Sequence, residues 1–221
     1  MPHRDYRAWN LPPTTTTGSS LERLEALKEL NFQCFELLAA QSRAASGGDF
    51  PLGGLIELWN SLDGAARVRA VDYPYLLFDA GFTDPQRWRR PVEPQVNESR
   101  AEPYESFFTV PGAVQVAWQV FVHAWSSARE YPTNAILTLG MHPQSARLIA
   151  AHTSASLYKM VERHWTWLRP RWLDKPEFWH ELLLGGVEGG EAHASALLHG
   201  VRLLTAELAT AQHRREKRSR R

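Results

Sequence analysis

The chain has 221 residues, 43% of them hydrophobic and 22% charged, a balance that excludes a largely disordered protein and a length sufficient for one sizeable core. The formal net charge is +1, but residues 213–221 hold six Lys or Arg and one Glu, a local +5 that leaves about −4 for the rest. An acidic body of this kind excludes a protein that binds nucleic acid over its whole surface, so any such contact should be local.

Residues 1–18 contain two adjacent prolines and a run of threonines, and they predict a flexible arm because they offer no periodic apolar face. A helix is predicted to begin at residues 19–20, where a serine can cap it, and to end at Gly47-Gly48. It contains the single cysteine, Cys34, which we expect to be a buried small hydrophobe rather than a nucleophile.

The next elements are less regular. Apolar residues predict a second helix over Leu52–Ala66, and the short aromatic stretch Asp72–Phe82 predicts a small helix. Thr83–Thr109 holds four prolines among charged residues, which predicts a long surface connection and marks the best candidate domain boundary.

Apolar periodicity predicts the remaining helices between Pro111 and Pro132, and then over Asn134–Leu139, Pro143–Ala150, Ser154–Trp167, Pro176–Leu184 and Glu191–Gln212. The glycines at 185–186 and 189–190 are expected to break the chain between the last two. Because no stretch alternates like an exposed strand, the sequence predicts an all-α fold, a multi-helix bundle over residues 19–212 with a basic tail over 213–221.

Residues 146–164 (ARLIAAHTSASLYKMVERH) predict two closely packed helices joined by a turn at residues 152–154. This is the geometry of a helix-turn-helix motif, in which the second helix enters the major groove of DNA. The predicted DNA-binding residues are Ser154, Ser156 and Lys159 near the bases, with Arg147 and Arg163 near phosphates. An ordinary pair of packed helices remains an alternative, since the pattern fits any all-α protein.

The basic tail offers a second place for phosphates. Its Arg214, Arg215, Lys217 and Arg218 are predicted to neutralise DNA phosphates, and such binding weakens steeply with salt. A solvated terminus or an acidic protein partner explains the same residues.

Two aromatic clusters are candidates for binding. Trp118, Phe121 and Trp125 share one helix face, which is wide enough for deep burial or for a protein partner. His164–Trp172 (HWTWLRPRW) would be able to stack a ligand beside two arginines, although core packing is the more common fate of such aromatics.

Nothing in the sequence marks a catalytic or metal site. The nine histidines include no HExxH spacing, and neither a glycine-rich phosphate loop nor a GxSxG nucleophile motif occurs. No apolar run approaches the roughly 20 residues of a membrane-spanning helix, and the N-terminus lacks the apolar core of a signal peptide. We therefore expect a cytoplasmic protein that is not an enzyme, carries no cofactor or metal and does not enter a membrane.

Three separated segments carry a resemblance: LKELNFQCFELLAAQ (27–41), NAILTLGMHPQSARLIAAHTSASLYKMVE (134–162) and AHASALLHGVRLLTAEL with the basic end (192–221). In this order they resemble FlhD, a subunit of the bacterial flagellar master transcriptional activator. The resemblance implies an all-helical oligomer that works with a second protein, FlhC, to bind promoter DNA and engage RNA polymerase. It also implies that Leu139, Gly140 and Ala146 are packed, and that Lys159 and the tail arginines are on the polar surface. Residues 48–131 have no counterpart in that family and form an insert.

The sequence therefore favours a transcriptional regulator similar to FlhD, acting with a protein partner or as a homo-oligomer and contacting DNA locally. Two alternatives stay open. One is a structural or adaptor protein that docks a larger assembly through residues 51–88 and 110–125. The other is a helical enzyme or ligand-binding protein with a pocket under Trp165, Trp167 and Trp172.

Overall fold

The computed structural model describes residues 20–44, 50–89 and 106–219, with the side chains of 211–219 left aside. The predicted arm over residues 1–18 lies outside this range. The described elements, in chain order, are α1 (Ser20–Ala44), a 3-10 turn (Gly53–Leu55), α2 (Ile56–Ser61), α3 (Gly64–Ala70), β1 (Phe78–Asp79), α4 (Ala113–Glu130), α5 (Pro132–Thr138), α6 (Pro143–Ala150), α7 (Ser154–His164), a 3-10 turn (Trp165–Trp167), β2 (Arg169–Pro170), α8 (Pro176–Glu188) and α9 (Gly190–Ser219). The predicted all-α, multi-helix fold is confirmed.

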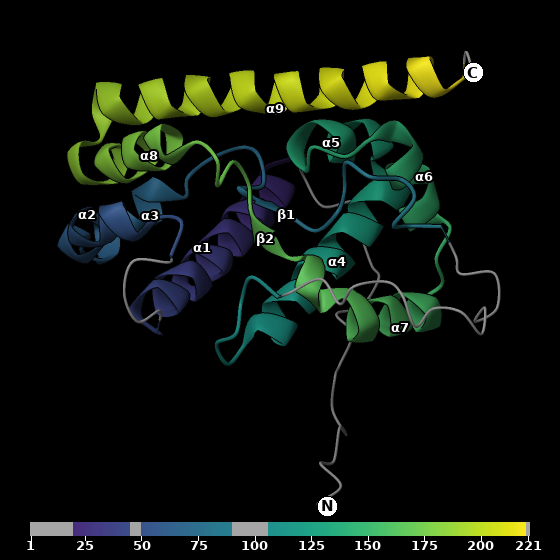
Figure 1. Cartoon of the computed structure of the whole chain (residues 1–221), viewed down its shortest axis with the longest axis horizontal. Coiled ribbons are helices and arrows are strands. Elements are labelled where there is room, and N and C mark those ends of the chain that lie inside the picture. Colours follow the sequence, from purple (N-terminus) through teal and green to yellow (C-terminus); the bar gives the residue numbers. More distant parts are fainter. Residues whose placement is uncertain (1–19, 45–49, 90–105, 220–221) are drawn as a thin grey trace, which may run out of the picture.

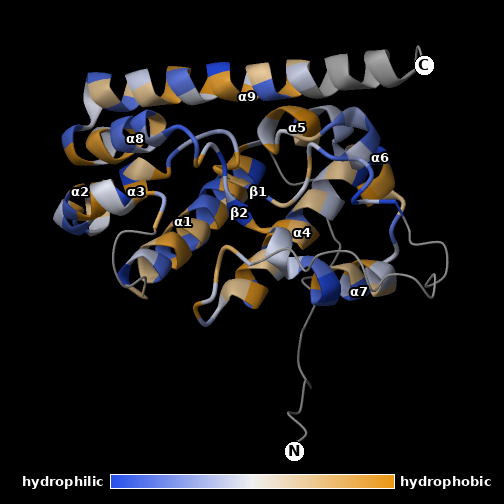
Figure 2. Cartoon of the chain, viewed as in Figure 1, coloured by the Kyte–Doolittle hydropathy of each residue, from blue (hydrophilic) through white to orange (hydrophobic). Residues whose placement is uncertain are grey.

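The helices pack around α1 and α4, which contact each other in the middle of the molecule (Figure 1). α8 packs against both α3 and α9, and α9 runs along one whole edge of the molecule. α7 lies at the opposite edge in the same view. Hydrophilic and hydrophobic residues both occur along α9 (Figure 2), as expected for a helix with one face on the core and one toward solvent. No helix in the described part of the chain has the length and apolar character needed to cross a membrane.

The predicted first helix is confirmed as α1, which buries one continuous face. Its buried apolar residues recur at helical spacing and are Leu27, Leu30, Cys34, Phe35, Leu37 and Leu38. The Phe35 ring stacks on Trp59 of α2, with ring centroids 4.5 Å apart. Sequence periodicity alone was therefore sufficient to find this part of the core.

The small helix predicted over Asp72–Phe82 is wrong, because none of these residues is helical and Phe78–Asp79 form a short strand. Asn31 of α1 holds it: the Asn31 Nδ2 donates to the Tyr75 carbonyl at 2.9 Å, and its Oδ1 accepts from the Leu77 amide at 2.9 Å. The segment then forms β1, which pairs antiparallel with β2. A fully buried asparagine can satisfy the backbone groups of an extended chain, and here that tertiary interaction outweighs the local pattern.

Two predicted helix boundaries also need correction. The second helix is not continuous. α2 ends at Ser61, and Asp63 then caps α3 by accepting from the Ala66 amide at 2.7 Å. Conversely, α8 continues through Gly185-Gly186 to Glu188. These glycines permit close packing rather than a break, since a Cβ on Gly186 would lie 2.8 Å from the Ala66 carbonyl oxygen of α3.

The connection predicted over Thr83–Thr109 is not wholly at the surface. Trp88 is fully buried, and its indole nitrogen donates to the Gly81 carbonyl at 3.0 Å. Phe108, near the other end, is 1% exposed. Residues 90–105 lie outside the described range. Both described ends of this proline-rich stretch therefore belong to the core, and the expectation of a purely external connection is wrong for them.

Candidate nucleic-acid interface

The two helices predicted to form a helix-turn-helix are α6 and α7, joined by residues 151–153. Both starts are fixed by local capping. The His142 side chain accepts from the Gln144 amide at 3.0 Å at the start of α6. At the start of α7, Thr153 Oγ1 accepts from the Ser156 amide at 3.2 Å and the Thr153 amide donates to Ser156 Oγ at 2.9 Å. This reciprocal capping box fixes the angle at which the chain enters α7.

α6 and α7 each pack on α4, which acts as their common support. α7 buries Leu157, Met160 and Val161. The turn before α7 is held from α4 as well, because the Trp125 indole nitrogen donates to the His152 carbonyl at 2.8 Å. One face of α7 is thus immobilised by tertiary contacts.

The other face of α7 is open. Ser154, Lys159 and Arg163 are exposed, and so is Arg147 on α6. Arg147, Lys159 and Arg163 form no ion pair with any residue that the structure describes. Three exposed cations that pair with no described carboxylate are suited to contact an anionic partner.

Ser156 does not belong to this open face. It is half-buried, and its hydroxyl is occupied by the capping box and by the His152 Nδ1 atom at 3.1 Å. The prediction that Ser156 faces a DNA base is therefore wrong, because the hydroxyl already serves the turn. It is also unsuited to act as a nucleophile paired with His152, since it is held by backbone groups.

The tail cations Arg214, Arg215, Lys217 and Arg218 fall on the last turns of α9, and their side chains lie outside the described residues. The C-terminal end of α9 lies at the edge of the molecule opposite to α7, with α6 between them (Figure 1). The predicted cationic groups therefore form two separate places on the molecule rather than one continuous surface.

The aromatic face predicted to bind a protein partner is covered by the chain itself. Phe121 is fully buried, 5.2 Å from the Trp88 ring centroid, so its predicted role as a partner contact is wrong. Trp118 packs edge-on against Tyr158 of α7 at 5.6 Å. Trp125 is half-buried and bonded to the turn before α7. Trp118 and Trp125 of this face therefore pack against α7 and the turn before it, within the same chain.

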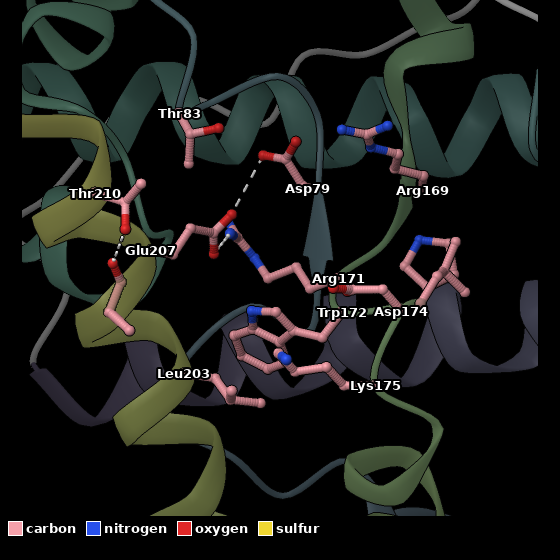
Figure 3. Close-up of a pocket in the computed structure, with 13 residues that line it drawn as sticks. Asp79, Thr83, Arg169, Arg171, Trp172, Asp174, Lys175, Leu203, Glu207 and Thr210 are labelled. Atoms are coloured by element: carbon pink, nitrogen blue, oxygen red, sulfur yellow. Dashed lines mark hydrogen bonds and ion pairs between the residues drawn. The ribbon is translucent and has the colours of Figure 1, made fainter. Parts of the chain in front are cut away.

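The tract His164–Trp172 divides between core and pocket. Trp167 packs against His164, with ring centroids 4.1 Å apart, and is 8% exposed. Trp172 instead lines a pocket of about 460 Å³ between the segment after β2 and α9 (Figure 3). Of the three tryptophans predicted to line a pocket, Trp165, Trp167 and Trp172, only Trp172 lines this one.

Sequence reasoning missed Arg171, which organises this region. Its side chain is 1% exposed, and its Nη1 forms an ion pair with Glu207 Oε2 of α9 at 2.7 Å. The other donors of the guanidinium group reach the carbonyls of Leu76, Phe78 and Leu139. The only signal in the sequence was a cation among tryptophans, which does not distinguish a ligand-facing arginine from a buried one.

The described residues offer no group of three or more His, Cys, Asp or Glu side chains that would hold a metal ion. Burial raises the pKa of the Cys34 thiol, which disfavours the reactive thiolate. No protein-family model matches the chain, and neither a curated protein nor a solved structure matches it.

Proposed function

We propose that this protein is an all-helical regulator of transcription, similar in role to FlhD, that works with a protein partner or a second copy and contacts DNA through α7. The observation that carries the proposal is the exposed group of Arg147, Lys159 and Arg163, which no described carboxylate neutralises, on two helices held rigidly by α4.

The shape of the surface supports this function. α7 has 11 residues and only one buried face, so its first turns are accessible to the major groove. Ser154 lies exposed at the start of the helix, and the exposed Lys159 and Arg163, four residues apart, share one face of α7 that is able to approach DNA. Arg147 on α6 and Arg163 at the end of α7 are exposed cations, which suits the contacts with phosphates that we assign to them.

The cationic end of α9 has a different role in this proposal. Because it lies away from α7, it would contact more distant phosphates or an acidic surface of the partner. The local charge of about +5 over residues 213–221 gives it long-range attraction for either.

The test is fluorescence anisotropy of labelled promoter fragments with the full chain. We expect binding at about 50 mM salt that weakens roughly 40-fold at about 200 mM if three phosphates are neutralised. Replacing Arg147, Lys159 and Arg163 together with glutamine should remove most of this affinity and of its salt dependence. Arg202→Gln is the matched control, because Arg202 is an exposed arginine on α9 away from α7.

Absence of binding at about 50 mM salt, both alone and with a native cell extract, would contradict the DNA contact. Removal of residues 213–221 separates the two cationic places: a loss confined to this deletion, with the triple variant unchanged, would assign the contact to the tail instead. Retention of a protein partner by chains that bind no DNA would favour the adaptor alternative.

A further inference from the structure

The outward face of α9 carries apolar residues that the described chain leaves exposed. Leu198 is 57% exposed and Val201 is 40% exposed, whereas α9 packs on the rest of the chain through another face, which holds the buried Leu204. Together with the exposed Ala194 and Thr205, the two residues recur at spacings of four, three and four. This is the spacing of the residues at which two helices of a coiled coil meet. We call Ala194, Leu198, Val201 and Thr205 the outer seam.

The position of α9 leaves room for a second helix beside the outer seam. α9 has 30 residues, a length of about 45 Å, and it forms one edge of the molecule, with the other described helices all on its inner side (Figure 1). The α9 helix of a second copy has the same length and presents the same residues. Two copies related by a two-fold axis therefore cover the seam of each other in one closed interface.

The charges at the two ends of α9 favour an antiparallel pair. Glu188 and Glu191 are exposed beside the first residue of α9, and neither forms an ion pair with a described residue. Residues 213–221, at the other end, carry a local charge of about +5. An antiparallel pair brings the acidic end of each helix near the basic end of the other, whereas a parallel pair brings the two basic ends together.

We propose that two copies of the chain form an antiparallel dimer through the outer seam. In the coiled-coil register, Leu198 of each copy packs against Val201 of the other, and Ala194 packs against Thr205. α7 lies at the edge of the molecule opposite to α9, so both α7 helices stay accessible in the dimer. The inference rests on the proposed function for its biological role, because it names the second copy with which a DNA-binding chain acts.

Sedimentation equilibrium of the full chain without DNA tests the dimer. We expect an equilibrium of monomer and dimer with a Kd below about 50 µM. Leu198→Glu combined with Val201→Glu places like charges in the seam and should weaken association at least about tenfold. Val68→Glu combined with Val114→Glu is the matched control, because it makes the same change of charge at two exposed valines on α3 and α4.

The control variant should associate as the unchanged chain does, and circular dichroism confirms that both double variants are folded. A chain that is monomeric at every concentration up to about 200 µM would overturn the proposal. Equal association by the folded seam variant and the unchanged chain would overturn it as well, since the seam would then not form the interface.

Disulfide cross-linking in a Cys34→Ala chain tests the orientation. The chain with both Ala194→Cys and Thr205→Cys should form a covalent dimer on mild oxidation, because each cysteine faces the other kind across the seam. Neither substitution alone should do so, since the two copies of one position lie about 16 Å apart along an antiparallel pair. Cross-linking of each single variant as readily as the double variant would contradict the antiparallel arrangement.

The dimer and the DNA contact are measured separately. A chain that stays monomeric in sedimentation but binds promoter DNA in the anisotropy experiment would contradict only the dimer. A dimer that binds no promoter DNA, and that the seam variant dissociates, would support the interface and contradict only the proposed function.

Discussion

Arg171 and Glu207 form an ion pair, with 2.7 Å between Nη1 and Oε2. Arg171 directly follows β2, the strand that pairs with β1, so the ion pair joins this small sheet to the long helix α9. Arg171 is 1% exposed, while the Glu207 side chain is 28% exposed. Asp79 lies near the same guanidinium group, 3.7 Å from Nη2, and is fixed by the amides of Gly81 and Phe82. The buried charge is thus satisfied by two carboxylates, Asp79 and Glu207, and by three backbone carbonyls, those of Leu76, Phe78 and Leu139.

Replacing Arg171 should be strongly destabilising. Arg171→Met leaves Asp79 buried without its cation and leaves the carbonyls of Leu76, Phe78 and Leu139 without donors, so we expect a loss of about 3–5 kcal/mol in the free energy of unfolding. Chemical denaturation measures it. Arg169→Met, at an exposed position two residues away, should change the value by less than about 0.5 kcal/mol. A loss below about 1 kcal/mol for Arg171→Met would show that the network contributes little.

The contact between Gly200 of α9 and Tyr75 leads to a second prediction. A Cβ at position 200 would overlap the Tyr75 hydroxyl and lie 2.6 Å from its ring carbon Cζ. Gly200→Ala should therefore destabilise the protein by about 1–3 kcal/mol, even though alanine favours a helix over glycine. Gly64→Ala is the control, because nothing lies within 4 Å of a Cβ there, and it should be neutral or stabilising.

The double variant tests the cause of that loss. Tyr75→Phe removes the oxygen that overlaps the added methyl group, so its combination with Gly200→Ala should recover part of the stability lost by Gly200→Ala alone. Strictly additive losses would mean that the clash with the hydroxyl is not the cause.

The elements that were predicted correctly depend on local interactions, and those that were missed depend on contacts between distant residues. Local signals found α6, with the predicted bounds Pro143–Ala150, and placed the start of α7 at Ser154, because a proline and a capping box act within one turn. They failed over 72–82, where the decisive partners, Asn31 and Arg171, lie 40 or more residues away. Of the α7 residues predicted to face outward, Ser154, Lys159 and Arg163 are exposed and Ser156 is not. The pocket under α9 left no periodic signal in the sequence, because segments far apart in the chain pack together to form it.

Cys34 is predicted to be unreactive in the folded protein. It is fully buried, and burial raises the pKa of its thiol, so both access and thiolate formation are disfavoured. Labelling with a thiol reagent that gives a coloured product should be at least about 100-fold slower than labelling of Ser195→Cys in a Cys34→Ala chain, since Ser195 is exposed on α9. Denaturant should remove the difference. Rapid labelling of the native protein would contradict the buried position of this residue.

His123 of α4 should make the protein less stable in mild acid. Burial lowers the pKa of His123 to about 4, whereas the unfolded chain titrates near the ordinary value of 6.5. Above pH 6.5 both states are neutral at this residue. As the pH falls from 6.5 toward 4, the unfolded state binds a proton that the folded state does not, so the free energy of unfolding decreases by at most about 3 kcal/mol.

Urea titrations between pH 7 and pH 4 measure this decrease. His123→Leu should have a flatter dependence on pH over that interval than the unchanged chain, because the proton uptake of the unfolded state at this position is removed. His180→Leu replaces an exposed histidine on α8 and serves as the matched control. Equal slopes for His123→Leu and the unchanged chain would contradict this prediction. They would mean that His123 binds a proton as readily in the folded protein as in the unfolded one, whereas burial should disfavour its charged form.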